Sequence, residues 1–539
     1  MRLGAGERRG TRRGARARWA GQWHVGTGLL AAVALAVLAS ARPVPATTLE
    51  WQPVADPSYR ELELLRASGL VDSASVLFSR PMARGTAAAL VARARRLHAD
   101  SHDPGLVRLE REFGRELVDR GFPPPAGYTP PLLSRGDPEG DGRVRLFAYG
   151  DGSVADSAGK TQVAYGSRAG GRLNLEQGSA LLHLDAFVGR VRNARLFADP
   201  LVAGHDLLGT TEDTYVSVGS RWLEVAFGRS RIAWGPGSTG SLLWSASAEP
   251  FTFLEFSKTI LGHVRATAVH ADVDAATGAR IAGHRLEWFP SSTVEVGVAE
   301  AVRYSSPTWE PLYVFPLLPF TWVQRLAAQD TLGSGRGGAA LRNNVMASID
   351  VSWRARAGNV LYGEFLLDDL ALAKGGIPTR LGYQAGWLGT GSVSARRGHW
   401  RAEYSRVYNY VYSTFYGESF IHHGRPIGYP VGPDSRNLRV EGTLDMNADW
   451  QVSVGATKTD RGAGELGRFY DPALGDASGS RLSGVIETTR SADAGVRFAP
   501  RDGMDLSFTL ARDWLKNQAH VAGDAHERWR AALGVRLRK

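Results

Sequence analysis

The fold is decided near the end of the chain, by MDLSFTLA at residues 504–511 and WRAALGVRLR at residues 529–538. In both stretches the apolar side chains fall on every second residue. Successive residues of a β-strand point to opposite sides, so this period of two predicts strands with one apolar face and one polar or small face. The apolar face of the first stretch consists of Met504, Leu506, Phe508 and Leu510.

The same alternation recurs upstream, for example over 438–445 and 450–457. A soluble β-sandwich also alternates, but its strands usually run only about five or six residues. These segments run about 9–12 residues, the length that a tilted strand needs to cross a bilayer. Their second face is often small or charged, which suits a wet lumen. The pattern therefore predicts a mainly β chain that forms a transmembrane antiparallel β-barrel.

The connections between these segments alternate in length. Short turns are predicted near 290–292, 357–359, 447–448 and 500–503, and long connections near 304–342, 414–436, 460–479 and 516–526. In outer-membrane barrels the tight turns face the periplasm and the long loops face outside. The pattern requires 480–499 to be one long strand, and it weakens before residue 258. An even-number expectation gives about 18 strands over residues 140–539, with about sixteen as the alternative.

The first 41 residues are predicted to be a secretory signal peptide. Seven arginines precede the apolar stretch Gly28–Ala39, which is too short to span a bilayer. Small residues suited to cleavage follow at 39–41 and again at 44–46. This segment carries +6 of the formal net charge of +10, so only +4 remains on the rest of the chain. The other basic residues are spread along strands, which argues against a nucleic-acid partner.

Residues 47–135 are predicted to form a small helical module followed by a proline-rich linker. Ser58 and Glu61 have the spacing of a capping box, and Gly69 would end that helix. A second helix is predicted over 86–97. Asp103-Pro104 would begin a third, which would run to Gly121. Because short helices bury little core alone, we expect the module to dock on the barrel from the periplasmic side.

Several segments, taken in order, resemble the Wzi family of capsule assembly proteins. They are SRP at 79–81, GRSRIAWGPG at 228–237, LLWS at 242–245, AEPF at 248–251, YGEFLLDD at 362–369 and GRPIGYPVGPD at 424–434. The resemblance covers nearly all of the chain after the signal. It implies an outer-membrane barrel that binds surface polysaccharide and helps to organise it on the cell. The non-aromatic end, Leu537-Arg538-Lys539, and the many arginines depart from the expected pattern and leave the glycan's identity open.

Nine residues in or near these segments are candidate glycan ligands. Aromatic rings stack on the C–H faces of sugars, and arginine forks grip the carboxylates of acidic glycans. Carboxylates at a strand end could bind sugar hydroxyls, hold Ca²⁺ or act as an acid–base pair. As alternatives, the tryptophan segment packs inside the lumen and the carboxylates pair with Arg354 or Arg356. The nine are Arg229, Arg231, Trp234, Trp244, Glu364, Asp368, Asp369, Tyr429 and Asp434.

The long aromatic loops over 304–342 and 414–436 are a second candidate surface for glycan. Their alternative role is loop packing or a membrane-interface belt. His422 and His423 lie in the second loop, but adjacent residues of an extended chain point different ways and chelate poorly. The chain has no cysteine, which excludes thiolate metal sites. We expect neither a metal nor a cofactor.

The sequence favours a non-enzymatic outer-membrane protein, most simply a monomer. Its expected partners are exported surface or capsular polysaccharide and outer-membrane lipids. One rival is a barrel enzyme that acts on lipid or lipopolysaccharide, for which His183 and His270 are the available bases. Phosphate-loop, HExxH and GxSxG motifs are absent from the sequence. Another rival is a passive porin, which the helical module and the Gly/Pro/Trp segment would obstruct.

Overall fold

The computed structural model describes residues 49–71, 77–136, 140–157, 160–192, 202–204, 207–220, 223–274, 277–306, 309–314, 318–323, 343–369, 378–414, 418–474, 476 and 479–539. The predicted signal peptide lies outside this part of the chain. Within it, none of the helices is long and apolar enough to cross a membrane.

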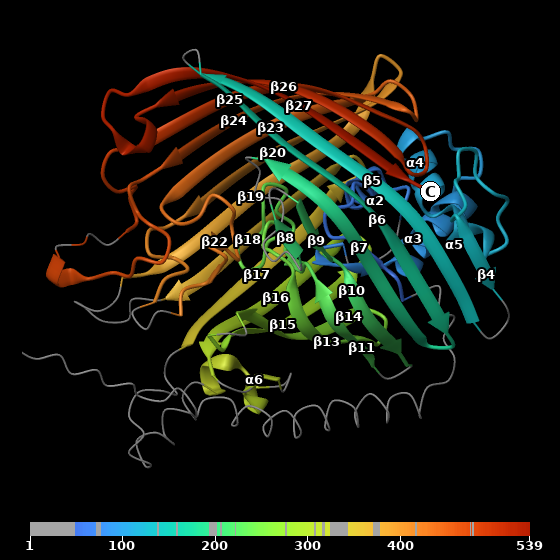
Figure 1. Cartoon of the computed structure of the whole chain (residues 1–539), viewed down its shortest axis with the longest axis horizontal. Helices are drawn as coiled ribbons and strands as arrows, with labels where there is room; N and C mark the ends of the chain where they lie inside the picture. The colour runs from blue at the N-terminus through green and yellow to red at the C-terminus, as the bar shows by residue number, and fades with distance from the viewer. Residues whose placement is uncertain are drawn as a thin grey trace, which may run out of the picture.

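Eighteen antiparallel strands close into a barrel (Figure 1). The ring closes where β27 pairs with β5, from Arg528↔Ser157 to Arg538↔Phe147. This confirms the predicted fold class and the predicted number of about 18 strands. The strands of the ring are β5 (Gly140–Ser157), β6 (Lys160–Gln177), β7 (Ala180–Arg192), β10 (Thr214–Gly219), β11 (Glu224–Ser230), β13 (Phe251–Ile260), β14 (Val264–Asp274), β15 (Ala279–Ser291), β16 (Val294–Ser305), β17 (Asn343–Arg356), β18 (Asn359–Asp369), β19 (Arg380–Val393), β20 (Arg396–Val407), β23 (Ser435–Asp445), β24 (Trp450–Arg461), β25 (Glu487–Arg501), β26 (Met504–Lys516) and β27 (Ala525–Arg538).

Three short strands lie beside the closed ring. β4 (Leu133–Gly136) pairs with the start of β5. β9 (Leu207–Thr210) pairs with the end of β7, and β8 (Val202–Gly204) pairs with β9. β10 pairs with the beginning of β7.

The pairing of β26 with β27 shows how the alternating pattern makes the wall. The two strands pair without interruption from Met504↔Leu537 to Lys516↔Ala525. Phe508 and Leu533 lie opposite each other on the outer face and remain 47% and 54% exposed. Ser507 and Gly534 occupy the other face, toward the lumen. An apolar exterior around a polar interior is the arrangement of a transmembrane barrel.

The predicted strand over 480–499 begins later than expected, because β25 starts at Glu487. Residues 479–486 belong to the preceding loop, where Gly479 and Gly484 adopt left-handed backbone conformations. Such conformations interrupt an extended strand, and the alternation of side chains alone does not reveal them.

The predicted tight turns and long loops lie at opposite ends of the barrel, since neighbouring strands are antiparallel. Long connections span 306–342, 408–434, 462–486 and 517–524. They contain α6 (Pro311–Val314), the pair β21 (Ile421–His422) and β22 (Arg425–Pro426), and the 3₁₀ turns η2 (Pro472–Leu474) and η3 (Gln518–His520). The helical module contacts the tight turns: Ala67 O accepts the N–H of Gly358 at 2.7 Å.

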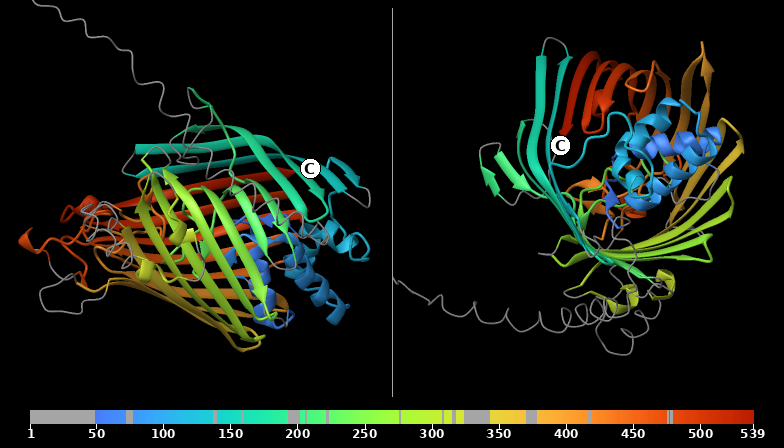
Figure 2. Two further views of the ribbon diagram at one scale, coloured as in Figure 1. Left: turned by 90° about the horizontal axis from the view of Figure 1, so that it is seen from below. Right: turned by 90° about the vertical axis from the view of Figure 1, so that its right-hand side faces the viewer.

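The module consists of α2 (Ser58–Ser68), α3 (Arg84–Leu97), α4 (Pro104–Glu112) and α5 (Gly114–Val118). Two small strand pairs complete it: β1 (Trp51–Gln52) pairs with β3 (Met82–Ala83), and β2 (Ser79–Arg80) pairs with β12 (Ala233–Trp234) from the barrel chain. A separate apolar cluster that includes Tyr59, Leu65, Val91 and Leu106 holds the helices together. In Figure 2, right, the helices (blue) lie within the ring of strands.

The helix boundaries test the predicted caps. Asp103 caps α4 by accepting the N–H groups of Gly105 and Leu106, and Gly69 ends α2 in a left-handed conformation, both as predicted. The predicted capping box at Ser58 is wrong. Pro57 is the N-cap residue, and the Glu61 side chain pairs with Arg108 instead. The third predicted helix is divided at Phe113 into α4 and α5.

Candidate functional site

Two segments of chain fold into the lumen and together form a plug. One is 231–250, between β11 and β13, and the other is 408–434, between β20 and β23. The Ser245 N–H donates to the Ile427 carbonyl at 2.9 Å, which joins the two segments. Gly240 has a φ of +131°, and a Cβ there would lie 2.2 Å from Pro430, so only glycine fits this close approach. The plug is therefore one packed unit.

Aromatic rings form the centre of the plug. The rings of Trp234 and Trp244 are 5.0 Å apart at 60°, and Trp244 meets Phe251 edge-on at 5.4 Å. Trp234 and Trp244 are only 2% and 0% exposed, and Tyr429 is fully buried. Aromatic side chains enclosed in this way stabilise the plug by burial and edge-to-face contact. In this arrangement they have no free face for stacking on a sugar.

Carboxylates of the barrel wall fix the plug in place. Glu364 of β18 accepts the N–H groups of Leu242 at 2.9 Å and Leu243 at 3.2 Å. Glu403 of β20 accepts those of Ser238 at 2.7 Å and Thr239 at 2.8 Å. Glu364 thus satisfies two buried amides, which need partners away from water, and Glu403 binds two amides in the more exposed part of the same loop. Glu403 was not among the predicted residues.

The second segment is held in the same way. Asp368 of β18 accepts the N–H of Tyr412 at 2.9 Å, and the Tyr412 hydroxyl donates to Leu242 O at 2.6 Å. The same hydroxyl accepts the N–H of Tyr429 at 2.9 Å. Tyr412 therefore connects the two segments of the plug at its middle. Of the arginines expected to pair with these carboxylates, Arg354 donates to the carbonyl of Arg66 at 3.2 Å. Asp369 pairs with a different arginine, Arg380 of the next strand.

The other predicted residues lie around the plug. Arg231 donates to the Ala248 carbonyl at 2.6 Å and is 22% exposed. Asp369 pairs with Arg380 and is 35% exposed. Asp434 is buried and accepts the Ser483 hydroxyl at 2.6 Å, which ties the plug to the loop over 462–486. Arg229, on β11, is partly exposed. The structure therefore brings Trp234, Trp244, Glu364, Asp368 and Tyr429 together in the plug and leaves Arg229, Arg231, Asp369 and Asp434 at or beyond its edge.

The histidines considered as bases are enclosed by polar partners. His183 hydrogen-bonds the Asn174 amide oxygen at 2.6 Å, and His270 bonds the Tyr304 hydroxyl at 2.5 Å. His422 stacks on Phe251 at 4.6 Å in the plug, and burial lowers its pKa to about 3. Within the described ranges, no three His, Asp or Glu side chains are arranged to hold a metal ion.

Ion pairs join the helical module to the barrel wall. Arg66 of α2 contacts Glu295 of β16 at 2.7 Å, and both side chains are almost fully buried. Other such pairs are Glu63–Arg401, Arg108–Asp445, Arg111–Asp449 and Glu112–Arg538. Burial by itself would raise the pKa of Glu112, but the guanidinium groups of Arg538 and Arg84 outweigh it and hold that pKa below its usual value. The interface therefore combines these ion pairs with a buried apolar contact, in which Leu64 and Ala67 of α2 pack against Val360, Tyr362 and Leu388 of the wall.

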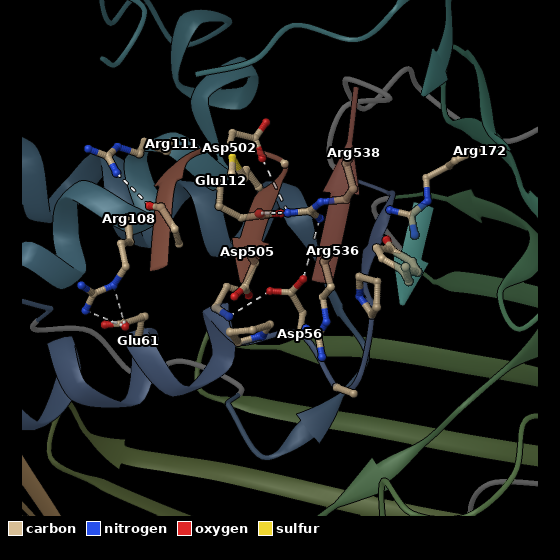
Figure 3. A pocket seen from close by; sticks show the side chains of 18 of the residues that line it. Asp56, Glu61, Arg108, Arg111, Glu112, Arg172, Asp502, Asp505, Arg536 and Arg538 are labelled. Atoms are coloured by element: carbon tan, nitrogen blue, oxygen red, sulfur yellow. Dashed lines mark hydrogen bonds and ion pairs between the residues drawn. The ribbon is translucent and has the colours of Figure 1, made fainter. Parts of the chain in front are cut away.

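A cavity of about 200 Å³ lies between the module and one side of the barrel (Figure 3). The residues before α2 and those of α4 line one side, and β5–β7 and β25–β27 line the other. Most of its arginines are paired: Arg538 contacts Glu112 at 2.6 Å, and Arg172 contacts Asp185 at 2.8 Å. Burial and the charge of Glu112 raise the pKa of Asp502, in the turn beside this cavity, to about 6.

The outer loops expose a different set of side chains. Trp322 is 61% exposed, although Phe320 beside it is fully buried against Tyr313. Arg425 and Arg468 keep 37% and 41% of their side chains exposed. Two other aromatic residues of the predicted loops, Phe315 and Tyr416, lie outside the described residues. The segment that carries Trp322 packs on the outer face of β15 and β16, where Phe320 contacts His284, so the exposed ring is compatible with both expected roles of this loop, a glycan surface and a membrane-interface belt.

Comparisons with known proteins agree with this architecture. The family model described as capsule assembly protein Wzi matches residues 148–528. A solved structure described as Wzi, an outer membrane protein involved in group 1 capsule assembly in Escherichia coli and a carbohydrate-binding β-barrel, is similar with a TM-score of 0.60 and 15% identity. The match covers 90% of this chain and 99% of that one. Pseudomonas aeruginosa OprD matches with a TM-score of 0.41 and 10% identity, over 73% of this chain and 95% of its own. Comparison with curated proteins by sequence gives no match.

Proposed function

Because the chain belongs to the Wzi family of capsule assembly proteins, which the match over residues 148–528 shows, we propose that it binds exported surface polysaccharide at the outer membrane. It would assemble or hold that polysaccharide at the cell surface without catalysing a reaction. The barrel with an apolar exterior supports the location, and the long loops then face outside. The helical module, at the tight-turn end, faces the periplasm.

The observation that carries this proposal is the plug. A porin needs an open lumen, whereas here the Trp234–Trp244 segment and the 408–434 segment are packed inside it. The wall carboxylates Glu364 and Glu403 fix that packing by accepting backbone amides of the loop. A barrel built to keep its lumen filled is better suited to presenting a rigid outer surface than to passing solutes.

We propose that the plug residues support the site and that exposed side chains touch the glycan. Trp322 offers an open ring for stacking on a sugar. Arg425 and Arg468 offer guanidinium groups to acidic sugars or hydroxyls. Among the nine residues predicted from sequence, Arg229, Arg231 and Asp369 keep enough exposure to contact a ligand directly.

A deletion in the producing cell tests this function. Loss of the gene should move surface polysaccharide from the cell-bound fraction to the medium, and the wild-type gene should restore it. A Trp322→Ala gene should restore less, while expressing an equally folded barrel. An unchanged cell-bound fraction after deletion would contradict the proposed function.

A further inference from the structure

A band of basic side chains lies on the outside of the barrel, at the long-loop end of β23–β26. Arg436 and Lys458 are 46% and 45% exposed, and Arg512 is 38% exposed. Arg490 and Lys516 are also exposed. We call these the outer basic band: Arg436, Lys458, Arg490, Arg512 and Lys516.

Strand alternation places the band on the outer face. Lys458 has the same parity as Val454, which is 63% exposed, and Arg490 has the parity of Val496. Arg512 lies between the outward residues Leu510 and Trp514 of β26, and its guanidinium is 5.3 Å from the Trp514 ring. Because period two fixes the side, the basic side chains share a face with the apolar belt.

The register brings like charges together. Lys458 is directly opposite Arg490 in the β24–β25 pairing. Side chains so placed have Cβ atoms about 4.5–5.5 Å apart, and like charges there are destabilising. Within the described part of the chain, neither Arg490 nor Lys516 has a side-chain hydrogen bond or ion pair. An anion between them would remove this repulsion.

The carboxylates that contact the band do not balance it. Asp460 accepts from Arg436 at 2.7 Å and lies 3.4 Å from Lys458. Glu527 pairs with Arg512. Five cations thus meet two carboxylates, and the remaining positive charge faces outward.

The level of the outer basic band relative to the membrane can be inferred from the tryptophans beside it. Trp514 and Trp529 lie beside it on the outer face, 38% and 47% exposed. Exposed tryptophans of membrane barrels mark the level where hydrocarbon gives way to lipid headgroups. Arg490 lies directly opposite Trp514 in the β25–β26 pairing, so the band is at headgroup level.

We propose that the outer basic band binds the phosphate groups of a phosphorylated glycolipid of the outer leaflet, the class to which lipid A belongs. One phosphate is bridged by Lys458 and Arg490, because guanidinium and ammonium groups form strong charge-assisted hydrogen bonds with phosphate oxygens. Arg436 of β23 and Lys516 of β26 lie on either side of this pair, and each could bind a second phosphate. This inference rests on the proposed function for the membrane location but not for the glycan.

Lipid binding to the purified full-length chain in detergent tests the proposal. The probes are lipid A with two phosphates, lipid A with one phosphate, and inorganic phosphate, each measured by native mass spectrometry. The test variant is Lys458→Gln/Arg490→Gln. The matched control is Arg190→Gln, which removes one exposed charge from the long-loop end of β7, away from the band. Heat-modifiable migration on gels confirms that each barrel is folded.

Wild-type protein should retain two-phosphate lipid A. The double variant should bind it at least about tenfold more weakly, the order expected for one lost charge-assisted contact. The control should stay within about twofold of wild type, and the one-phosphate lipid should bind less well. Equal lipid A binding by the double variant and wild type would overturn the proposal. So would an absence of binding, or full competition by inorganic phosphate at equal concentration. Binding of surface polysaccharide to the same samples shows separately whether the proposed function holds.

Discussion

Glu364 of β18 accepts the backbone N–H of Leu242 at 2.9 Å and thereby fastens the plug to the barrel wall. The two residues are 122 positions apart in the chain. Glu403 does the same for Ser238 and Thr239 from the next but one strand. The lumen is therefore closed by contacts between wall carboxylates and loop amides, so these contacts are where the barrel can be opened by mutation.

Glu403→Ala should loosen the plug. The change removes the acceptor for the partly buried amides of Ser238 and Thr239 and for the buried Tyr362 hydroxyl, which donates at 2.7 Å. Leaving the buried hydroxyl unpaired costs about 1–3 kcal/mol, and the partly buried amides lose their anchor to the wall. Conductance in planar bilayers should rise from near zero to frequent openings, whereas the outer-face control Glu527→Gln should stay closed. A silent Glu403→Ala barrel would argue that other contacts hold the plug.

Arg66→Met should weaken docking of the helical module. It leaves Glu295 buried without its partner at 2.7 Å, which typically costs about 3–5 kcal/mol. The exposed pair Arg60–Glu441 is a matched control, and Arg60→Met should cost about 1 kcal/mol or less. Urea unfolding in detergent measures both. Similar losses for the two variants would contradict a stabilising role for the buried Arg66–Glu295 pair.

Lowering the pH from 7 to 4 should raise the free energy of unfolding through Asp502. Its pKa is raised to about 6 by burial and by the charge of Glu112, whereas an unfolded aspartate titrates near about 3.9. Asp502 therefore contributes stability that is complete below about pH 4 and is lost as the pH rises through about 6. Relative to Asp502→Asn, the wild type should lose on the order of 2 kcal/mol of unfolding free energy between pH 4 and 7. Parallel pH profiles for the two proteins, with Asp471→Asn as control, would refute this assignment.

Substitution of Trp244 and of Trp322 should affect different properties, namely stability for Trp244 and polysaccharide binding for Trp322. Trp244→Ala empties a fully buried position and should cost about 3–5 kcal/mol of stability. Trp322→Ala removes an exposed ring, so it should change stability by no more than about 0.5 kcal/mol. Polysaccharide binding should nevertheless weaken in Trp322→Ala. Thermal unfolding and polysaccharide binding are measured on the same preparations. Unchanged polysaccharide binding by Trp322→Ala would show that this ring does not contact the glycan.

Local signals made much of the fold predictable. The alternation around Phe508 and Leu533 reflects the two-residue period of a strand, which any stretch of sequence can report. The Asp103-Pro104 cap of α4 is equally local and is confirmed. The Ser58–Glu61 capping box failed because Glu61 is drawn to Arg108 and Arg397, a charge pairing across the module and the wall. Such pairing depends on docking and leaves no mark at the helix start.

The site was less predictable for the same reason. The segment around Trp234 stood out by its glycines and aromatics, but nothing local shows whether a ring faces solvent or a plug. Glu403 lies on an ordinary alternating strand, so its partnership with Ser238 appears only once the barrel closes. Lys458 and Arg490 likewise become neighbours only through the β24–β25 register.

The central claim is most directly tested by equilibrium binding of the detergent-solubilised protein to surface polysaccharide purified from its own cells. The protein should bind saturably. Trp322→Ala should bind more weakly, and Arg229→Ala/Arg231→Ala will report whether the edge of the plug takes part. Absence of saturable binding by the folded wild-type barrel would contradict the account.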